Sequence, residues 1–162
     1  MLIKLKNKDT LIADDFIFKC CVGKNGLKRN KIEGDKSTPR GKFSLGKLYY
    51  RSDRVNKPIT KLKLKKINKN MGWSIDIRKN YNSEIIINKK IKHEKLFRKD
   101  FKYDYLIVIN YNTKKKVANR GSAIFIHLTK NFNPTAGCIA IKKNDFLILA
   151  KILTRKSKIE IY

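Results

Sequence analysis

The sequence predicts a mainly β fold, of the β-rich α+β class, with one or two short helices. Three observations lead to this prediction. Most apolar runs are short and rich in β-branched and aromatic residues, as strands are. Glycine, asparagine and proline interrupt the chain between those runs, where turns are expected. Only residues 145–154 repeat their apolar side chains at the spacing of an amphipathic helix.

The expected strands lie in both halves of the chain. Each is a run of residues with high β propensity that is bounded by turn-forming residues. In chain order they cover residues 2–5, 11–22, 41–50, 103–110, 121–128, 139–141 and 158–162.

The clearest helix is predicted over residues 145–154. Asn144 is the expected N-cap, and Asp145 lies at the positive end of the helix dipole. One face carries the apolar stripe of the helix, which consists of Phe146, Leu149, Ile152 and Leu153. A short second helix is expected over residues 92–98.

Length and composition fit one domain over residues 1–162, because 41% hydrophobic content is enough for a core. The 40 Lys and Arg against 13 Asp and Glu give a formal net charge of +27. Lysines occur in almost every segment, so we interpret them as a basic, solvated surface, and the heavy use of Lys, Asn and Ile indicates an AT-rich coding background. The alternative is a salt-sensitive attraction to an anionic polymer.

Nucleic-acid binding without catalysis is the alternative from another class. Aromatic residues interleaved with cations, as in KLYYRSDR, can stack on bases. No helix-turn-helix, zinc-finger or RNP motif is present, so no specific nucleic-acid partner is expected. The Tyr49–Tyr50 pair also fits the end of a strand with one buried face.

Cysteine and histidine spacing predicts no metal and no cofactor. Two histidines and three cysteines form neither H-E-x-x-H nor C-x-x-C. Cys20 and Cys21 are neighbours on an expected strand and point to opposite faces, so we interpret both as packing residues.

The most specific signal is residues 118–142, ANRGSAIFIHLTKNFNPTAGCIAIK. His127 closes an apolar run typical of a buried strand, and Cys138 follows eleven positions later. Asn-Pro and Gly between them predict a turn that brings Cys138 beside His127. A free thiol has a pKa near 8.5 and needs a base or a positive field to become nucleophilic, and His127 is the only base nearby.

Two neighbours of this pair are further candidates. Gly137 can take φ > 0, which lets a substrate carbonyl approach the backbone, so we expect the amides of Gly137 and Cys138 to form an oxyanion hole. Thr135 can orient the imidazole or bind a polar substrate group, because its hydroxyl both donates and accepts. The alternative is that His127 is a satisfied core residue and Cys138 a small buried hydrophobe.

Chain order separates this segment from two other hydrolase classes. Papain-like peptidases present Cys before His, whereas His comes first here. An α/β-hydrolase needs a G-x-S-x-G elbow, and none is present.

The segment resembles the catalytic segment of the L,D-transpeptidase (YkuD-type) family, in its PT-x-GC variant. GSAIFIHL, NPTAGCIAI and NDFLILAKIL carry the similarity, and a GD-x-x-TP-x-G-x-F core lies upstream, within residues 23–55. GW at Trp73, HEKL from His93 and YDYLIVINYN from Tyr103 extend it over nearly the whole chain. The resemblance implies a mixed-sheet sandwich in which Cys138 accepts an acyl group and His127 is its base. It also implies that Gly137 and Cys138 shape the oxyanion site.

The resemblance implies a substrate as well. Family members cleave a stem-peptide bond of peptidoglycan, hold the donor as a thioester and pass it to an amine or to water, so peptidoglycan stem peptides or muropeptides are the expected partners. An L,D-carboxypeptidase or amidase that hydrolyses the same peptides is the alternative. This chain has Leu128 and Ala136 where the better-studied branch has a Gly and a second His, and its His-to-Cys loop is shorter.

Three more residues are candidates for substrate binding. His93 lies in the HEKL match, and Tyr111 and Asn112 follow a strong strand. Their alternatives are a surface histidine and ordinary turn residues.

Location is inferred from two signals that differ. The first residues lack a sustained apolar h-region, and no stretch approaches the roughly 18 apolar residues of a membrane span. The resemblance implies action in the periplasm or cell envelope, and a cytoplasmic role on recycled muropeptides is the alternative.

Overall fold

The computed structural model describes residues 1–162 and consists of fourteen short strands and one helix. The prediction of a mainly β fold with mixed sheets is therefore confirmed. The strands are β1 (Leu2–Lys6), β2 (Thr10–Ala13), β3 (Phe16–Cys21), β4 (Leu27–Lys28), β5 (Thr38–Pro39), β6 (Gly41–Tyr50), β7 (Leu64–Lys66), β8 (Met71–Ser74), β9 (Ser83–Ile86), β10 (His93–Lys95), β11 (Tyr105–Ile109), β12 (Phe125–Leu128), β13 (Ile139–Ile141) and β14 (Lys158–Ile161). The helix is α1 (Lys143–Ile152).

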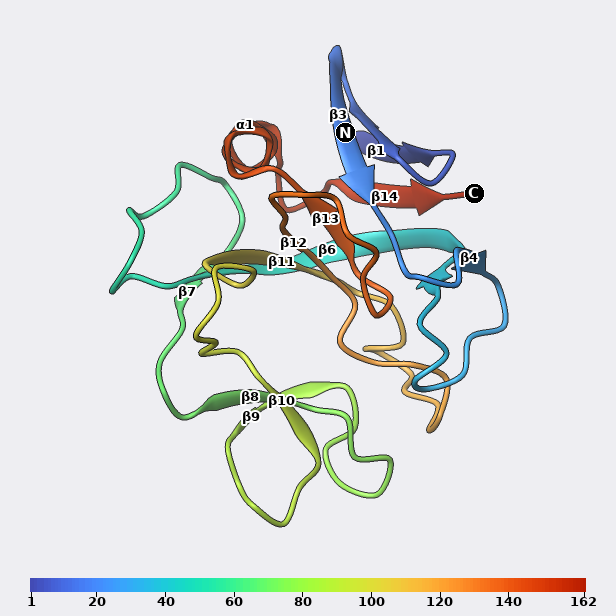
Figure 1. Cartoon of the computed structure of the whole chain (residues 1–162), viewed down its shortest axis with the longest axis vertical. Coiled ribbons are helices and arrows are strands. Elements are labelled where there is room, and N and C mark those ends of the chain that lie inside the picture. Colours follow the sequence, from blue (N-terminus) through green and yellow to red (C-terminus); the bar gives the residue numbers. More distant parts are fainter.

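Nine strands form one mixed sheet, in the order β11-β12-β13-β3-β2-β1-β14-β6-β7. β1 pairs with β14, β12 with β13 and β6 with β7 in parallel. β11 also pairs with β6, so the sheet curves back on itself. In Figure 1, β6 and β11 cross the middle of the molecule, with both termini on one side and the three-stranded sheet β10-β8-β9 on the other.

Alternate residues of the central strands point into two different cores. Ile126 and Ile139 belong to the larger core, which also contains buried residues of α1. Phe125 and Cys138 belong to the smaller core, on the opposite face. The three-stranded sheet covers this second face, where Trp73 packs edge-on against Phe125 at a centroid distance of 5.1 Å. The smaller core therefore supports one side of the segment predicted to be catalytic.

The helix begins earlier than predicted. Its N-cap is Lys142, which has extended backbone and no side-chain capping bond, so the expected cap at Asn144 and start at 145 are wrong. The chain enters the helix directly from β13, which leaves Asn144 inside the first turn. Phe146 and Leu149 are buried as predicted, and Leu153 is a buried C-cap. The helix is not long and apolar enough to cross a membrane.

The second expected helix, over residues 92–98, is wrong. This segment contains β10, which pairs antiparallel with β8 and places Glu94 opposite Trp73. Backbone pairing and burial outweigh the weak helical preference of the local sequence. The segment therefore belongs to the wall over the smaller core.

Two expected strands have different limits in the structure. Residues 11–22 form the hairpin of β2 and β3, because Asp14 takes a φ of 50° and turns the chain. Residues 121–124 are not extended, since Gly121 and Ala123 have φ values of 97° and 53°. Only residues 125–128 of the expected 121–128 strand therefore pair in the sheet.

Candidate active site

A cavity of about 540 Å³ opens on the face of β12 and β13 that carries the smaller core. His127 and Cys138 both line it, and residues of the loops 31–36 and 129–136 form much of its wall. The structure thus brings the two principal predicted residues together in one solvent-accessible space.

The parallel pairing of β12 with β13 sets the geometry of this pair. His127 lies opposite Ala140, so Cys138 lies two residues back along the neighbouring segment, next to Phe125. The Phe125 amide donates to the Cys138 sulfur at 3.4 Å. Residues two apart on a strand share a face, so the imidazole and the thiol project from the same face of adjacent chain segments.

His127 is held as a neutral base. Its Nδ1 lies 3.0 Å from the carbonyl oxygen of Leu128, which can only accept, so Nδ1 carries the proton and Nε2 keeps its lone pair. Burial lowers the pKa of His127 to about 4. At neutral pH the imidazole is therefore uncharged and Nε2 is unprotonated.

Cys138 is held as a thiol. Burial, together with the nearby charge of Glu94, raises its pKa to about 12. The sulfur donates to the carbonyl oxygen of Ala123 at 3.3 Å, and no hydrogen bond joins it to His127. The resting site therefore contains a neutral thiol and a neutral imidazole.

The turn before Cys138 is fixed by Thr135 and Gly137. The Thr135 hydroxyl donates to the Cys138 carbonyl at 2.6 Å and accepts from the Gly137 amide at 3.1 Å, with no contact to the imidazole. Gly137 has a φ of 139°, and a Cβ there would lie 2.9 Å from the Ser37 carbonyl oxygen. The Cys138 amide has no acceptor within the chain, whereas the Gly137 amide already donates to Thr135.

Glu94 lines the same cavity and was not predicted from the sequence. Its Oε1 accepts a hydrogen bond from the Tyr103 hydroxyl, and the Tyr103 ring packs edge-on against the imidazole of His127 at 5.3 Å. The signal that points to Glu94 is strand alternation, because His93 and Glu94 face opposite sides of β10. That signal exists only once residues 93–95 are identified as a strand.

The three residues predicted to bind substrate do not line the cavity. His93 hydrogen-bonds a neighbouring backbone carbonyl through Nδ1 at 2.7 Å. The Tyr111 hydroxyl donates to the Arg120 carbonyl. Asn112 donates to the Gly121 carbonyl at 3.0 Å and makes two further bonds that tie the 112–121 loop together. Substrate binding by these residues stays a prediction, and their contacts point to loop organisation.

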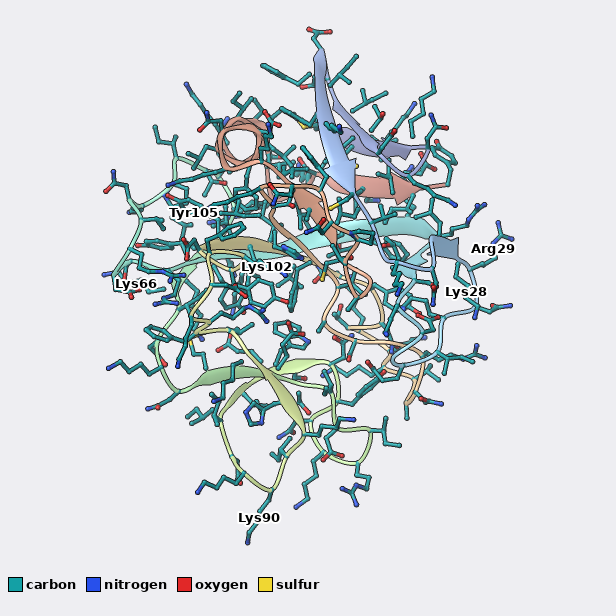
Figure 2. The ribbon with its side chains drawn as sticks, in the orientation of Figure 1. Lys28, Arg29, Lys66, Lys90, Lys102 and Tyr105 are labelled. Carbon is teal, nitrogen blue, oxygen red and sulfur yellow. The ribbon has the colours of Figure 1, made fainter.

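Several cations also line the cavity: Lys31, Lys36, Arg98, Lys102 and Lys130. In Figure 2, Lys102 lies near the middle of the molecule, whereas Lys28, Lys66 and Lys90 extend outward at three different edges. The structure contains no group of three or more His, Cys, Asp or Glu placed to hold a metal ion. Cys20 and Cys21 are buried and unpaired, as expected of packing residues.

Comparison with protein families finds a match over almost the whole chain. The YkuD family model, described as the L,D-transpeptidase catalytic domain, matches residues 3–161. A search of curated proteins found no match.

Proposed function

The chain belongs to the L,D-transpeptidase catalytic domain family, and on that basis we propose that it transfers acyl groups of peptidoglycan stem peptides through a thioester on Cys138. The observation that carries the proposal is the cavity shared by a neutral imidazole and a thiol on adjacent chain segments. A base and a nucleophile in one accessible space are the requirement for covalent acyl transfer.

In the first step, the sulfur of Cys138 attacks the carbonyl carbon of the donor peptide as its proton passes to Nε2 of His127. A C–S bond forms, and the carbonyl π electrons move onto oxygen. The tetrahedral intermediate then collapses, the C–N bond breaks, and His127 returns the proton to the leaving amine. A thioester and a neutral imidazole remain.

The hydrogen bonds of the resting site indicate when this step begins. The thiol proton is directed at the Ala123 carbonyl, not at His127. Rotation about the Cα–Cβ bond of Cys138 redirects the S–H toward the imidazole, and the proton leaves as the sulfur bonds to the donor carbonyl, so that no free thiolate forms in the buried site. Nucleophile activation therefore coincides with substrate binding.

The free amide of Cys138 is the oxyanion donor in this mechanism. One well-placed donor is worth about 2.7–4 kcal/mol in the transition state. Thr135 acts as a positioning residue, because its hydroxyl bonds the Cys138 carbonyl and the Gly137 amide at once. It fixes the two peptide units that flank the one carrying the Cys138 N–H.

In the second step, an amine or water attacks the thioester, His127 accepts its proton, and Cys138 leaves as a thiol. Transfer to an amine makes the chain a transpeptidase, and transfer to water makes it an L,D-carboxypeptidase or amidase. The family points to the cell envelope as the place of action. Stem peptides carry carboxylates, which the cations lining the cavity complement.

The test is to incubate the protein with a carbapenem and, separately, with purified muropeptides. We expect added mass on the peptide that contains Cys138, with no adduct and no new products for Cys138→Ala. Cys20→Ala is the matched control, because it removes another buried thiol that lies outside the cavity.

Full activity of a folded Cys138→Ala variant would overturn the mechanism. Cross-linked products identify a transpeptidase, whereas shortened stems without cross-links identify a hydrolase. Tight, salt-sensitive binding to oligonucleotides with no turnover would favour the nucleic-acid alternative.

A further inference from the structure

Glu94 presents one carboxylate oxygen to the cavity. Its Oε1 accepts from Tyr103, whereas Oε2 has no hydrogen-bond partner. Every fully buried side-chain N or O atom in the structure has a partner, so Oε2 is accessible to solvent. The side chain lines the cavity and is 29% exposed. This oxygen is therefore open to a ligand in the cavity.

The one cation that pairs with Glu94 does so at long range and through Oε1, not Oε2. Arg98 Nη1 lies 4.0 Å from Glu94 Oε1, while the same guanidinium is bonded through Nε and Nη2 to Asp100 at 2.9 Å and 2.6 Å. The chain has 40 Lys and Arg but only 13 Asp and Glu, so cations to pair with a carboxylate are plentiful. A carboxylate that keeps a free oxygen in the active-site cavity therefore suggests a cationic ligand.

A second carboxylate faces the same cavity. Glu33 accepts from the Tyr81 hydroxyl at 2.5 Å and the Ser122 hydroxyl at 2.7 Å, both through Oε2. It has no cation within ion-pair distance, and both Glu33 and Glu94 line the cavity. Burial raises the pKa of Glu94, and the charge of Glu33 adds to this effect. Two carboxylates in electrostatic contact complement a single positive charge between them.

Glu94 is also within electrostatic reach of the reacting atoms. Its charge is the largest contribution, after burial, to the raised pKa of Cys138. Through Tyr103 it is linked to the ring of His127. A group bound at Glu94 therefore shares the cavity with the thioester.

We infer that Glu94 binds the protonated amino group of the acyl acceptor and takes up its proton, so that the enzyme transfers its acyl group to a primary amine in preference to water. This inference rests on the thioester mechanism proposed above. The ammonium R–NH₃⁺ gives one proton to Glu94, and the nitrogen lone pair then attacks the thioester carbon. His127 takes the second proton and passes it to the departing sulfur, and Glu94 later releases its proton to solvent. An amide, a free thiol and one proton result.

The test compares two acceptors that differ in the ammonium alone, D-alaninamide and D-lactamide. With a muropeptide donor, the wild-type protein should transfer to D-alaninamide in preference to hydrolysis and should not use D-lactamide. Glu94→Gln should lower the ratio of transfer to hydrolysis by about tenfold or more, since a hydrogen bond to a charged group is lost. The rate of thioester formation at Cys138 is measured in parallel, so that the ratio of transfer to hydrolysis reports the acceptor step alone.

Glu84→Gln is the matched control, because Glu84 accepts from the Tyr49 hydroxyl and pairs with Lys65 but lies outside the cavity. It should leave the ratio unchanged. Transfer by Glu94→Gln should recover above about pH 9, where the amino group of D-alaninamide, with a pKa near 8, is already deprotonated. A merely structural role for Glu94 gives no such recovery.

Glu94→Asp, which keeps the carboxylate, should retain the preference for the amine and serves if the Gln variant does not fold. An unchanged ratio in a Glu94→Gln protein that still forms the thioester would overturn this inference and leave the proposed function standing. Failure of the wild-type protein to acylate Cys138 would overturn both.

Discussion

Cys138 and His127 are both held in their uncharged forms by the same physical cause. Burial disfavours the charged form of either group, so it raises the thiol pKa to about 12 and lowers the imidazole pKa to about 4. A resting thiolate–imidazolium pair needs both shifts in the opposite direction. The site therefore differs from thiol enzymes that keep a preformed thiolate, and its reactivity depends on what enters the cavity.

Alkylation of the free protein tests this resting state. Because only the thiolate reacts, the rate of iodoacetamide addition to Cys138 should be slow at pH 7 and rise about tenfold per pH unit through pH 9. Site-resolved mass spectrometry separates Cys138 from Cys20 and Cys21. Glutathione is the control, since its rate should level off near pH 9. A plateau for Cys138 below pH 7 would indicate a preformed thiolate.

The turn into β13 shows how a short element determines the site. The sequence predicts the reversal and the position of Cys138 after it, and allows a positive φ at Gly137, because Asn-Pro and Gly favour turns. It does not predict that Ser37, a hundred residues earlier, packs against Gly137 at a distance that excludes a Cβ. The conformation of a short turn can be predicted from its own residues, whereas a contact between distant segments cannot.

Replacing Gly137 by Ala measures how much the close packing of Gly137 against Ser37 matters for the free energy of unfolding. The new Cβ lies 2.9 Å from the Ser37 carbonyl oxygen at a φ of 139°, so both a clash and backbone strain are introduced. Gly34→Ala is the matched control, because Gly34 has a φ of 78° and nothing within 4 Å of a Cβ. Strain alone costs about 1–3 kcal/mol. In urea unfolding, Gly137→Ala should therefore lose clearly more free energy than Gly34→Ala, and equal losses would show that the turn relaxes freely.

The difference between local sequence signals and contacts between distant segments also explains which elements could be predicted. Residues 41–50 and 139–141 match β6 and β13, since both are apolar strands bounded by turns. The sheet β8–β10 was missed because its strands are only three or four residues long and are stabilised by pairing and by Trp73. Missing β10 also hid Glu94, whose direction into the cavity follows from the alternation of that strand.

The charge of the whole molecule is interpreted from the sequence as a solvated surface, and in the structure few of the cations pair with a carboxylate. Seven of the 40 Lys and Arg residues form ion pairs with a carboxylate. In Figure 2, Lys28 and Arg29, Lys66, and Lys90 extend outward at three different edges of the molecule. Unpaired cations at several edges of the molecule attract a polyanion without sequence preference. The many positive charges also repel one another in the folded state, which lowers its stability.

This repulsion predicts that salt stabilises the protein. At 10 mM ionic strength like charges interact over about 30 Å, and at 150 mM over about 8 Å. Raising NaCl from 10 to 300 mM should therefore increase the free energy of unfolding at pH 7 by on the order of 1 kcal/mol. The triple variant Lys66→Gln, Lys89→Gln, Lys90→Gln lowers the formal charge from +27 to +24, three fewer, and should gain less from salt. Denaturation in urea, which adds no ions, measures the free energy of unfolding of the wild-type protein and of the triple variant at each salt concentration. A free energy that falls with salt would mean that the few ion pairs outweigh the repulsion among the many unpaired cations.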